Sequence, residues 1–86
     1  MEIIIEDDEF IASYCYGCVN TAKKEYENGK LVGYKRIGEF MLSDEFDYET
    51  EESLISMAEL CIKYCSREKI DYKFKNPTIR REKIDE

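Results

Sequence analysis

Four cysteines are the residues of this chain best suited to metal or redox chemistry. They occur as two pairs, Cys15-x2-Cys18 and Cys61-x3-Cys65. Four thiolates can enclose a zinc ion tetrahedrally, and the spacing of Cys15 and Cys18 is one that zinc sites use. Because the chain contains no histidine, such a site would have to consist of the four cysteines alone. A structural zinc site is therefore one of three interpretations.

The other two interpretations are buried free thiols and a disulfide or redox pair. Reduced cysteines commonly pack in protein cores as small hydrophobic residues. Cys61 and Cys65 are one helical turn apart, so both would lie on the apolar face of a helix predicted there. We favour buried thiols and expect no cofactor, with zinc as the alternative.

Residues suited to catalysis are scarce. Without histidine, the side chain that most often serves as a general base at neutral pH is missing. Gly29, Gly33 and Gly38 are too scattered to form a phosphate-binding loop. Pairs of carboxylates are numerous, but any acidic surface contains such pairs by chance. We therefore expect a protein that is not an enzyme.

Carboxylates are concentrated in the middle of the chain. The stretch from Ser43 to Glu52 holds six acids and two aromatic residues, and no lysine or arginine occurs between Arg36 and Lys63. Ordinary protein surfaces intersperse charges of both signs, so this imbalance calls for a reason. The net charge of −7 argues against direct binding to DNA or RNA, because phosphates repel carboxylates.

The unbalanced charge predicts a docking surface for a basic protein. Spaced carboxylates raise the rate of encounter with a groove rich in lysine and arginine, and aromatic side chains can anchor the complex. Enzymes that hold nucleic acids have such grooves, so carboxylates placed there would compete with phosphates. The predicted partner-binding residues are Glu39, Phe40, Asp44, Glu45, Phe46, Asp47, Tyr48, Glu49, Glu51 and Glu52.

In size and charge the chain is similar to small acidic phage proteins that block CRISPR or restriction nucleases, although it shares no motif with them. This resemblance implies a nucleic-acid mimic that inhibits its partner. The alternative function is a structural zinc-binding or cysteine-containing adaptor. The basic residues near the C-terminus could also contact the acidic face of a second copy and give a homo-oligomer; they are Lys69, Lys73, Lys75, Arg80, Arg81 and Lys83.

Hydrophobic periodicity predicts the elements that position these residues. The β-branched run at 2–6 and the stretch at 31–42 predict strands, with Gly33 and Gly38 marking a bulge or a hairpin in the second. The alternation of apolar and charged residues at 70–75 predicts a further strand with one solvated face. Thr50, followed by an apolar stripe as far as residue 67, predicts a capped helix.

Residues 9–27 allow two interpretations. Their apolar residues recur at helical spacing, whereas the run from Tyr14 to Thr21 is poor in strong helix formers and rich in residue types that favour strands. Asn28-Gly29 could end a helix or form the turn of a hairpin. We favour the helix, because periodicity is the stronger signal.

The expected fold is therefore α+β, a two-layer sandwich of two helices on a small, mostly antiparallel sheet. The order is β-α-β-(β)-α-β, which is ferredoxin-like if residues 31–42 form a hairpin. Residues 1–75 would be a single domain and residues 76–86 a charged C-terminal tail. The chain shows no secretory signal and no apolar run near the roughly 20 residues of a membrane span, so we expect a cytoplasmic protein without membrane contact.

Overall fold

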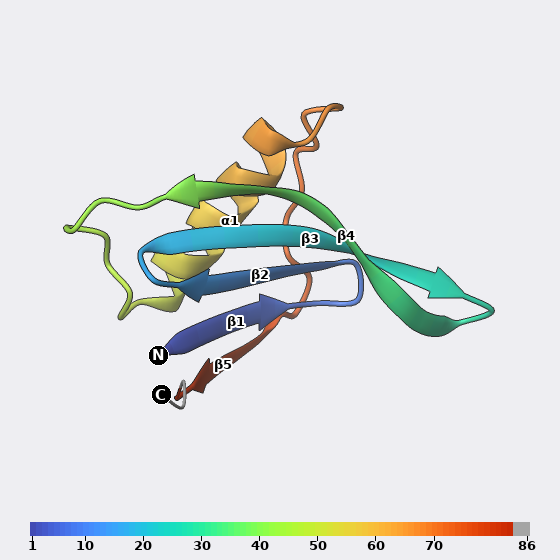
Figure 1. The fold of residues 1–86 in the computed structure, drawn as a ribbon, viewed down its shortest axis with the longest axis horizontal. Coiled ribbons are helices and arrows are strands. Elements are labelled where there is room, and N and C mark those ends of the chain that lie inside the picture. The colour runs from blue at the N-terminus through green and yellow to red at the C-terminus, as the bar shows by residue number, and fades with distance from the viewer. Residues whose placement is uncertain (84–86) are drawn as a thin grey trace.

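The computed structural model describes residues 1–83, which form a five-stranded antiparallel sheet with one helix on one of its faces (Figure 1). The strands are β1 (Glu2–Glu6), β2 (Phe10–Cys15), β3 (Cys18–Glu27), β4 (Lys30–Met41) and β5 (Thr78–Glu82). Helix α1 (Glu51–Cys65) connects β4 to β5. The order in the sheet is β4-β3-β2-β1-β5, so four strands form a meander and β5 returns to pair with β1.

The core lies between α1 and one face of the sheet. Buried and half-buried residues alternate along β1 and β2, as expected for strands with one face covered. Helix α1 begins after Thr50, whose side chain accepts a hydrogen bond from the backbone N–H of Ser53, so the predicted helix and its cap are confirmed. The central core residues are Ile3, Ile5, Ala12, Tyr14, Val19, Leu54, Ala58 and Cys61.

The predicted two-helix sandwich is wrong, because residues 10–27 form two strands. Tyr16-Gly17 joins β2 to β3, and Asn28-Gly29 joins β3 to β4. All four turn residues have positive φ, between 51° and 80°, which is the backbone conformation of the type I′ hairpin turn. The alternative left open for this segment, strands with a hairpin turn, is therefore the correct one, and the order β-β-β-β-α-β excludes a ferredoxin-like fold.

The predicted strand at 70–75 is also wrong. Its side chains alternate as expected, with Tyr72 and Phe74 half-buried between exposed charges. Two of its backbone N–H groups, however, donate to side-chain carboxylates and not to the carbonyl oxygens of a neighbouring strand. Phe74 N–H donates to Glu59 Oε2 (2.8 Å), and Lys75 N–H donates to Asp7 Oδ2 (3.0 Å). Alternation here reflects packing on the core and not membership of the sheet.

The C-terminal residues differ from the expected charged tail. Thr78–Glu82 form β5, which pairs antiparallel with all of β1. Ile79 packs against the core and accounts for this placement. Residues 84–86 of the expected tail lie outside the described residues.

The predicted strand at 31–42 is confirmed as β4, and its pairing with β3 has irregularities near Gly33 and Gly38. Within residues 1–83, no helix is long and apolar enough to cross a membrane.

Candidate functional site

The acidic stretch forms the loop between β4 and α1 together with the first turn of the helix (Figure 1). All six of its carboxylate residues are exposed. None of them forms a salt bridge with another described residue. We call this surface the acidic end; it consists of Asp44, Glu45, Asp47, Glu49, Glu51 and Glu52.

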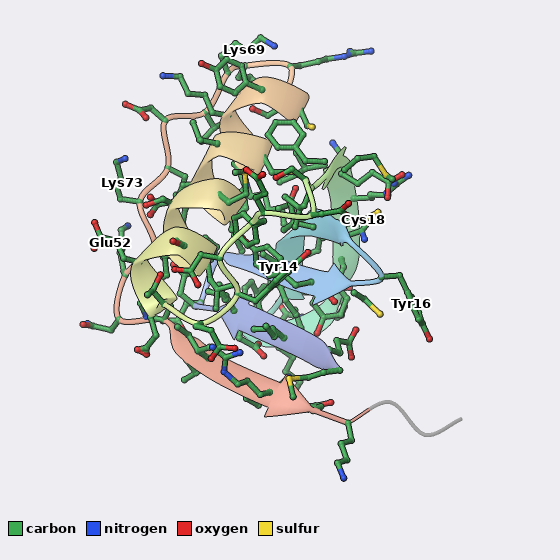
Figure 2. The ribbon with its side chains drawn as sticks, turned by 90° about the vertical axis from the view of Figure 1, so that its left-hand side faces the viewer. Tyr14, Tyr16, Cys18, Glu52, Lys69 and Lys73 are labelled. Carbon is green, nitrogen blue, oxygen red and sulfur yellow. The ribbon has the colours of Figure 1, made fainter. Side chains whose placement is uncertain are left out.

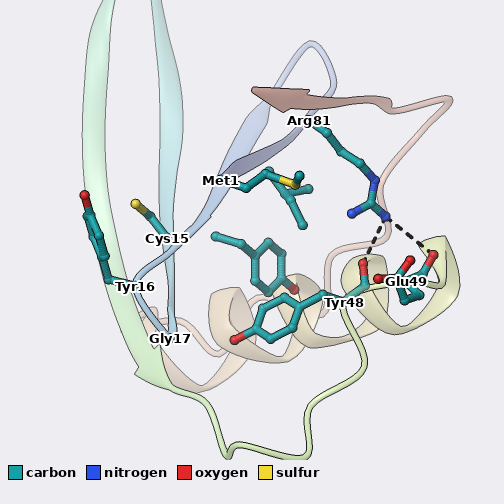
Figure 3. Close-up of a pocket in the computed structure, with 9 residues that line it drawn as sticks. Met1, Cys15, Tyr16, Gly17, Tyr48, Glu49 and Arg81 are labelled. Atoms are coloured by element: carbon teal, nitrogen blue, oxygen red, sulfur yellow. Dashed lines mark hydrogen bonds between the residues drawn. The ribbon is translucent and has the colours of Figure 1, made fainter. Parts of the chain in front are cut away.

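Hydrogen bonds fix the shape of the acidic end. Asp47 Oδ1 accepts the backbone N–H of Glu49 (2.8 Å), and Thr50 Oγ1 donates to Asp47 Oδ2 (3.0 Å). These two hydrogen bonds, first that from Glu49 and then that from Thr50, lower the pKa of Asp47. Arg81 donates to the carbonyl oxygens of Tyr48 (2.9 Å) and Glu49 (3.4 Å), as Figure 3 shows. This cation therefore binds backbone and leaves the carboxylates unpaired.

The aromatic residues of the stretch lie beneath the acidic end and are not exposed anchors. Phe46 stacks on Tyr14 with ring centroids 5.7 Å apart, and Tyr48 meets Phe46 edge-on at 4.8 Å. Phe40 also packs against the core. Packing of these half-buried rings on the core holds the loop against the sheet, so only part of each ring is left exposed to a partner.

Glu39 lies apart from the acidic end. Its carboxylate, near the end of β4, is 3.4 Å from Arg36. Glu59, also in the stretch without bases, lies 3.7 Å from Lys73 and accepts the N–H of Phe74. Basic residues from both sides of the stretch thus neutralise these two acids, and the candidate surface contracts to the six carboxylates of the acidic end. Figure 2 shows Glu52 on the outer side of α1.

A cavity of about 340 Å³ lies beside the acidic end, and Figure 3 shows its lining. Tyr14 contributes to this lining, but its hydroxyl donates to the carbonyl oxygen of Leu54 (2.5 Å). Burial raises the pKa of Tyr14, so the phenol stays neutral. The tyrosine therefore serves the core.

A basic groove of about 680 Å³, which the sequence did not predict, lies at the opposite end of α1. Its lining includes Lys23, Lys35, Arg36 and Arg67, with Glu68 as its acid. Lys23 and Lys35 face each other across β3 and β4, while Arg67 follows α1. The groove depends on the β3–β4 hairpin, so the signal that could have revealed it was Asn28-Gly29 taken as a turn.

The two cysteine pairs lie on opposite sides of the sheet. Cys61 and Cys65 face the sheet from α1, with their sulfurs 4.0 Å apart. Burial raises the pKa of the Cys61 thiol to about 11. Cys15 and Cys18 lie at half-buried positions that alternate with the core residues of β2 and β3. A four-cysteine zinc site is not formed, and no group of three or more cysteine, aspartate or glutamate residues suited to a metal occurs within residues 1–83.

No protein-family model matches the chain, and no curated protein or solved structure shows significant similarity to it. The function of the protein must therefore be inferred from the chemistry of its surfaces. The resemblance in size and charge to small acidic phage inhibitors stays a prediction.

Proposed function

We propose that this protein is a non-enzymatic binding protein that docks on a basic protein through its acidic end. The observation that supports this function is that six exposed carboxylates cluster at one end of the molecule without a basic partner among the described residues, whereas Glu6 has two basic partners. On the sheet face away from α1, Glu6 pairs with Lys24 (2.6 Å) and Arg80 (3.1 Å). The six carboxylates of the acidic end have no such partner among the described residues. Negative potential therefore projects from this end.

Structural roles account for only part of the acidic end. Glu51 and Glu52 lie in the first turn of α1, where the helix dipole favours negative charge. Asp47 holds the loop through its hydrogen bonds. Asp44 and Glu45 are exposed, and their carboxylates make no hydrogen bond or ion pair with another described residue. Their repulsion of neighbouring acids is a small cost to stability, which a basic partner would offset.

The partner class that fits best is a protein that handles nucleic acids. Its groove presents lysine and arginine to phosphates, and the acidic end would occupy that groove in their place. The protein would then block its partner as a nucleic-acid mimic. Because Phe40, Phe46 and Tyr48 are half-buried against the core, binding would depend mainly on electrostatics, and its affinity should fall steeply as salt rises.

Two matched charge-reversal variants test the docking surface. The first, Asp44→Lys/Glu45→Lys/Glu52→Lys, reverses three charges of the acidic end. The second, Glu25→Lys/Glu27→Lys/Glu68→Lys, reverses three exposed acids elsewhere and gives the same net charge. Capture of a basic, nucleic-acid-binding protein from lysate should be lost with the first variant and kept with the second. Equal behaviour of the two variants would refute a specific docking surface.

A second copy of the chain is the competing partner, because the basic groove could receive the acidic end. We expect the protein to remain monomeric in sedimentation velocity at low salt over a wide concentration range. Assembly that Lys23→Glu/Lys35→Glu abolishes would replace the proposed partner with the protein itself.

A further inference from the structure

Three sulfur-containing side chains form a row across three neighbouring strands. Cys15 of β2 is the register partner of Cys18 in β3, and Cys18 is the partner of Met41 in β4. Direct cross-strand partners project to the same face of a sheet, so the three side chains share the face away from α1. Cys18 Sγ lies 3.2 Å from Met41 Sδ. We call these residues the sulfur row.

The backbone around the sulfur row is fixed. The tight turn Tyr16-Gly17 joins Cys15 to Cys18, and the N–H of Leu42 donates to the carbonyl oxygen of Gly17 (2.8 Å). That hydrogen bond ties the end of β4, and with it Met41, to the turn. Tyr16 points away from the body of the molecule (Figure 2). Since Cys15 and Cys18 are half-buried and Met41 is 79% exposed, a solute can reach the row.

We propose that the sulfur row binds a soft monovalent metal ion, Cu(I). Thiolates and thioethers are the ligands that Cu(I) prefers. The thiolates of Cys15 and Cys18 together with the thioether of Met41 would form a three-coordinate site. Zinc fits less well, because its sites usually have four ligands and do not employ methionine. On binding, each cysteine thiol transfers its proton to water as its bond to copper forms, and the metal remains Cu(I). The inference does not depend on the proposed docking function.

The geometry allows all three sulfurs to reach one ion. Metal–thiolate bonds are about 2.3 Å long, so two sulfurs on the same ion are at most about 4.6 Å apart. The separation of 3.2 Å between Cys18 and Met41 meets this limit. Directly opposed residues of an antiparallel pair have Cβ atoms about 4.5–5.5 Å apart, so rotation about χ1 can bring Cys15 Sγ within range.

The other cysteine pair provides an internal comparison. Cys61 and Cys65 have sulfurs 4.0 Å apart, close enough to share an ion. Cys61 is fully buried, however, and its raised pKa keeps its thiol protonated. A metal would have to enter between α1 and the sheet to reach it. The structure therefore assigns copper to Cys15 and Cys18 and not to Cys61 and Cys65.

A competition titration tests this assignment. Reduced full-length protein is titrated with Cu(I) in the presence of a chromophoric chelator, and the copper–thiolate absorption is followed in the ultraviolet. We expect one Cu(I) per chain. Cys18→Ser should weaken binding by more than about 100-fold, since it removes a direct ligand, and Met41→Leu by roughly 10-fold. Cys65→Ala should bind as the unaltered protein does. Undiminished binding by Cys18→Ser, or tighter binding of Zn(II) than of Cu(I), would overturn the proposal.

Alkylation of the unaltered protein gives a second readout that is independent of how the variants fold. Cys15 and Cys18 should react with iodoacetamide without metal and be protected by one equivalent of Cu(I), as peptide mass spectrometry would measure. Equal modification of Cys15 and Cys18 with and without Cu(I) would contradict the site.

Discussion

At the residue scale, Asp7 connects the two halves of the chain. This carboxylate is only 9% exposed and accepts the backbone N–H groups of Glu9, Phe10 and Lys75. The hydroxyl of Tyr72 donates to it as well. Burial raises the pKa of Asp7, but these hydrogen bonds outweigh burial, and the pKa is lowered overall. The residue thus anchors the segment after α1 to the β1–β2 turn.

Replacing Asp7 with asparagine should destabilise the fold by about 1.5–3 kcal/mol at pH 7, because hydrogen bonds to a charged acceptor are lost. The contribution of Asp7 to the free energy of unfolding has a defined pH dependence. A lowered pKa stabilises the folded state at pH values above the ordinary aspartate pKa of 3.8 and ceases to do so as pH falls through the folded value.

Urea unfolding at pH 7 and pH 3 measures this effect. The difference between the unaltered protein and Asp7→Asn should shrink at the lower pH. The neighbouring exposed Asp8→Asn serves as control and should change stability little at either pH. A difference that stays constant with pH would show that Asp7 acts through shape alone.

At the element scale, some sequence patterns were sufficient to predict a helix or strand and others were not. Helix α1 was predictable because Thr50 and the apolar stripe agree. The strands within residues 10–27 were not predictable, because apolar residues such as Phe10 and Tyr14 are four positions apart. That spacing places two side chains on one face of a helix and equally on one face of a strand. The tight turns Tyr16-Gly17 and Asn28-Gly29 make this segment two strands of the sheet. In the acidic end, exposure of the carboxylates followed from the sequence, whereas burial of Phe46 depends on Tyr14, which is distant in the chain.

The contact between α1 and β4 leads to a prediction about two glycines. A Cβ atom on Gly38 would lie 2.6 Å from the Cβ of Cys65 and 2.7 Å from its sulfur, whereas one on Gly33 would meet no atom within 4 Å. Gly38→Ala should therefore destabilise the protein by about 1–3 kcal/mol, as overpacking does.

Gly33→Ala in the same strand is the matched control and should be close to neutral, since its backbone does not need positive φ. Thermal unfolding of both variants measures the difference. Equal melting temperatures for the two would mean that α1 does not pack against β4 as described.

At the scale of the whole molecule, charge is separated along α1. The acidic end lies at its N-terminus, and the basic groove contains residues from its C-terminus onward. The helix dipole favours this arrangement at both ends. The separation orients the protein in the field of a charged partner, so it should accelerate a specific encounter more than the net charge of −7 alone would.

The measurement that tests the docking function most directly is competition for the captured partner. Labelled nucleic acid bound to that partner is titrated with the protein, and its release is followed by fluorescence anisotropy. We predict that the unaltered protein displaces the nucleic acid, and that Asp44→Lys/Glu45→Lys/Glu52→Lys needs at least about 10-fold higher concentration for the same displacement. Simultaneous binding of protein and nucleic acid, or undiminished displacement by the triple variant, would contradict the account.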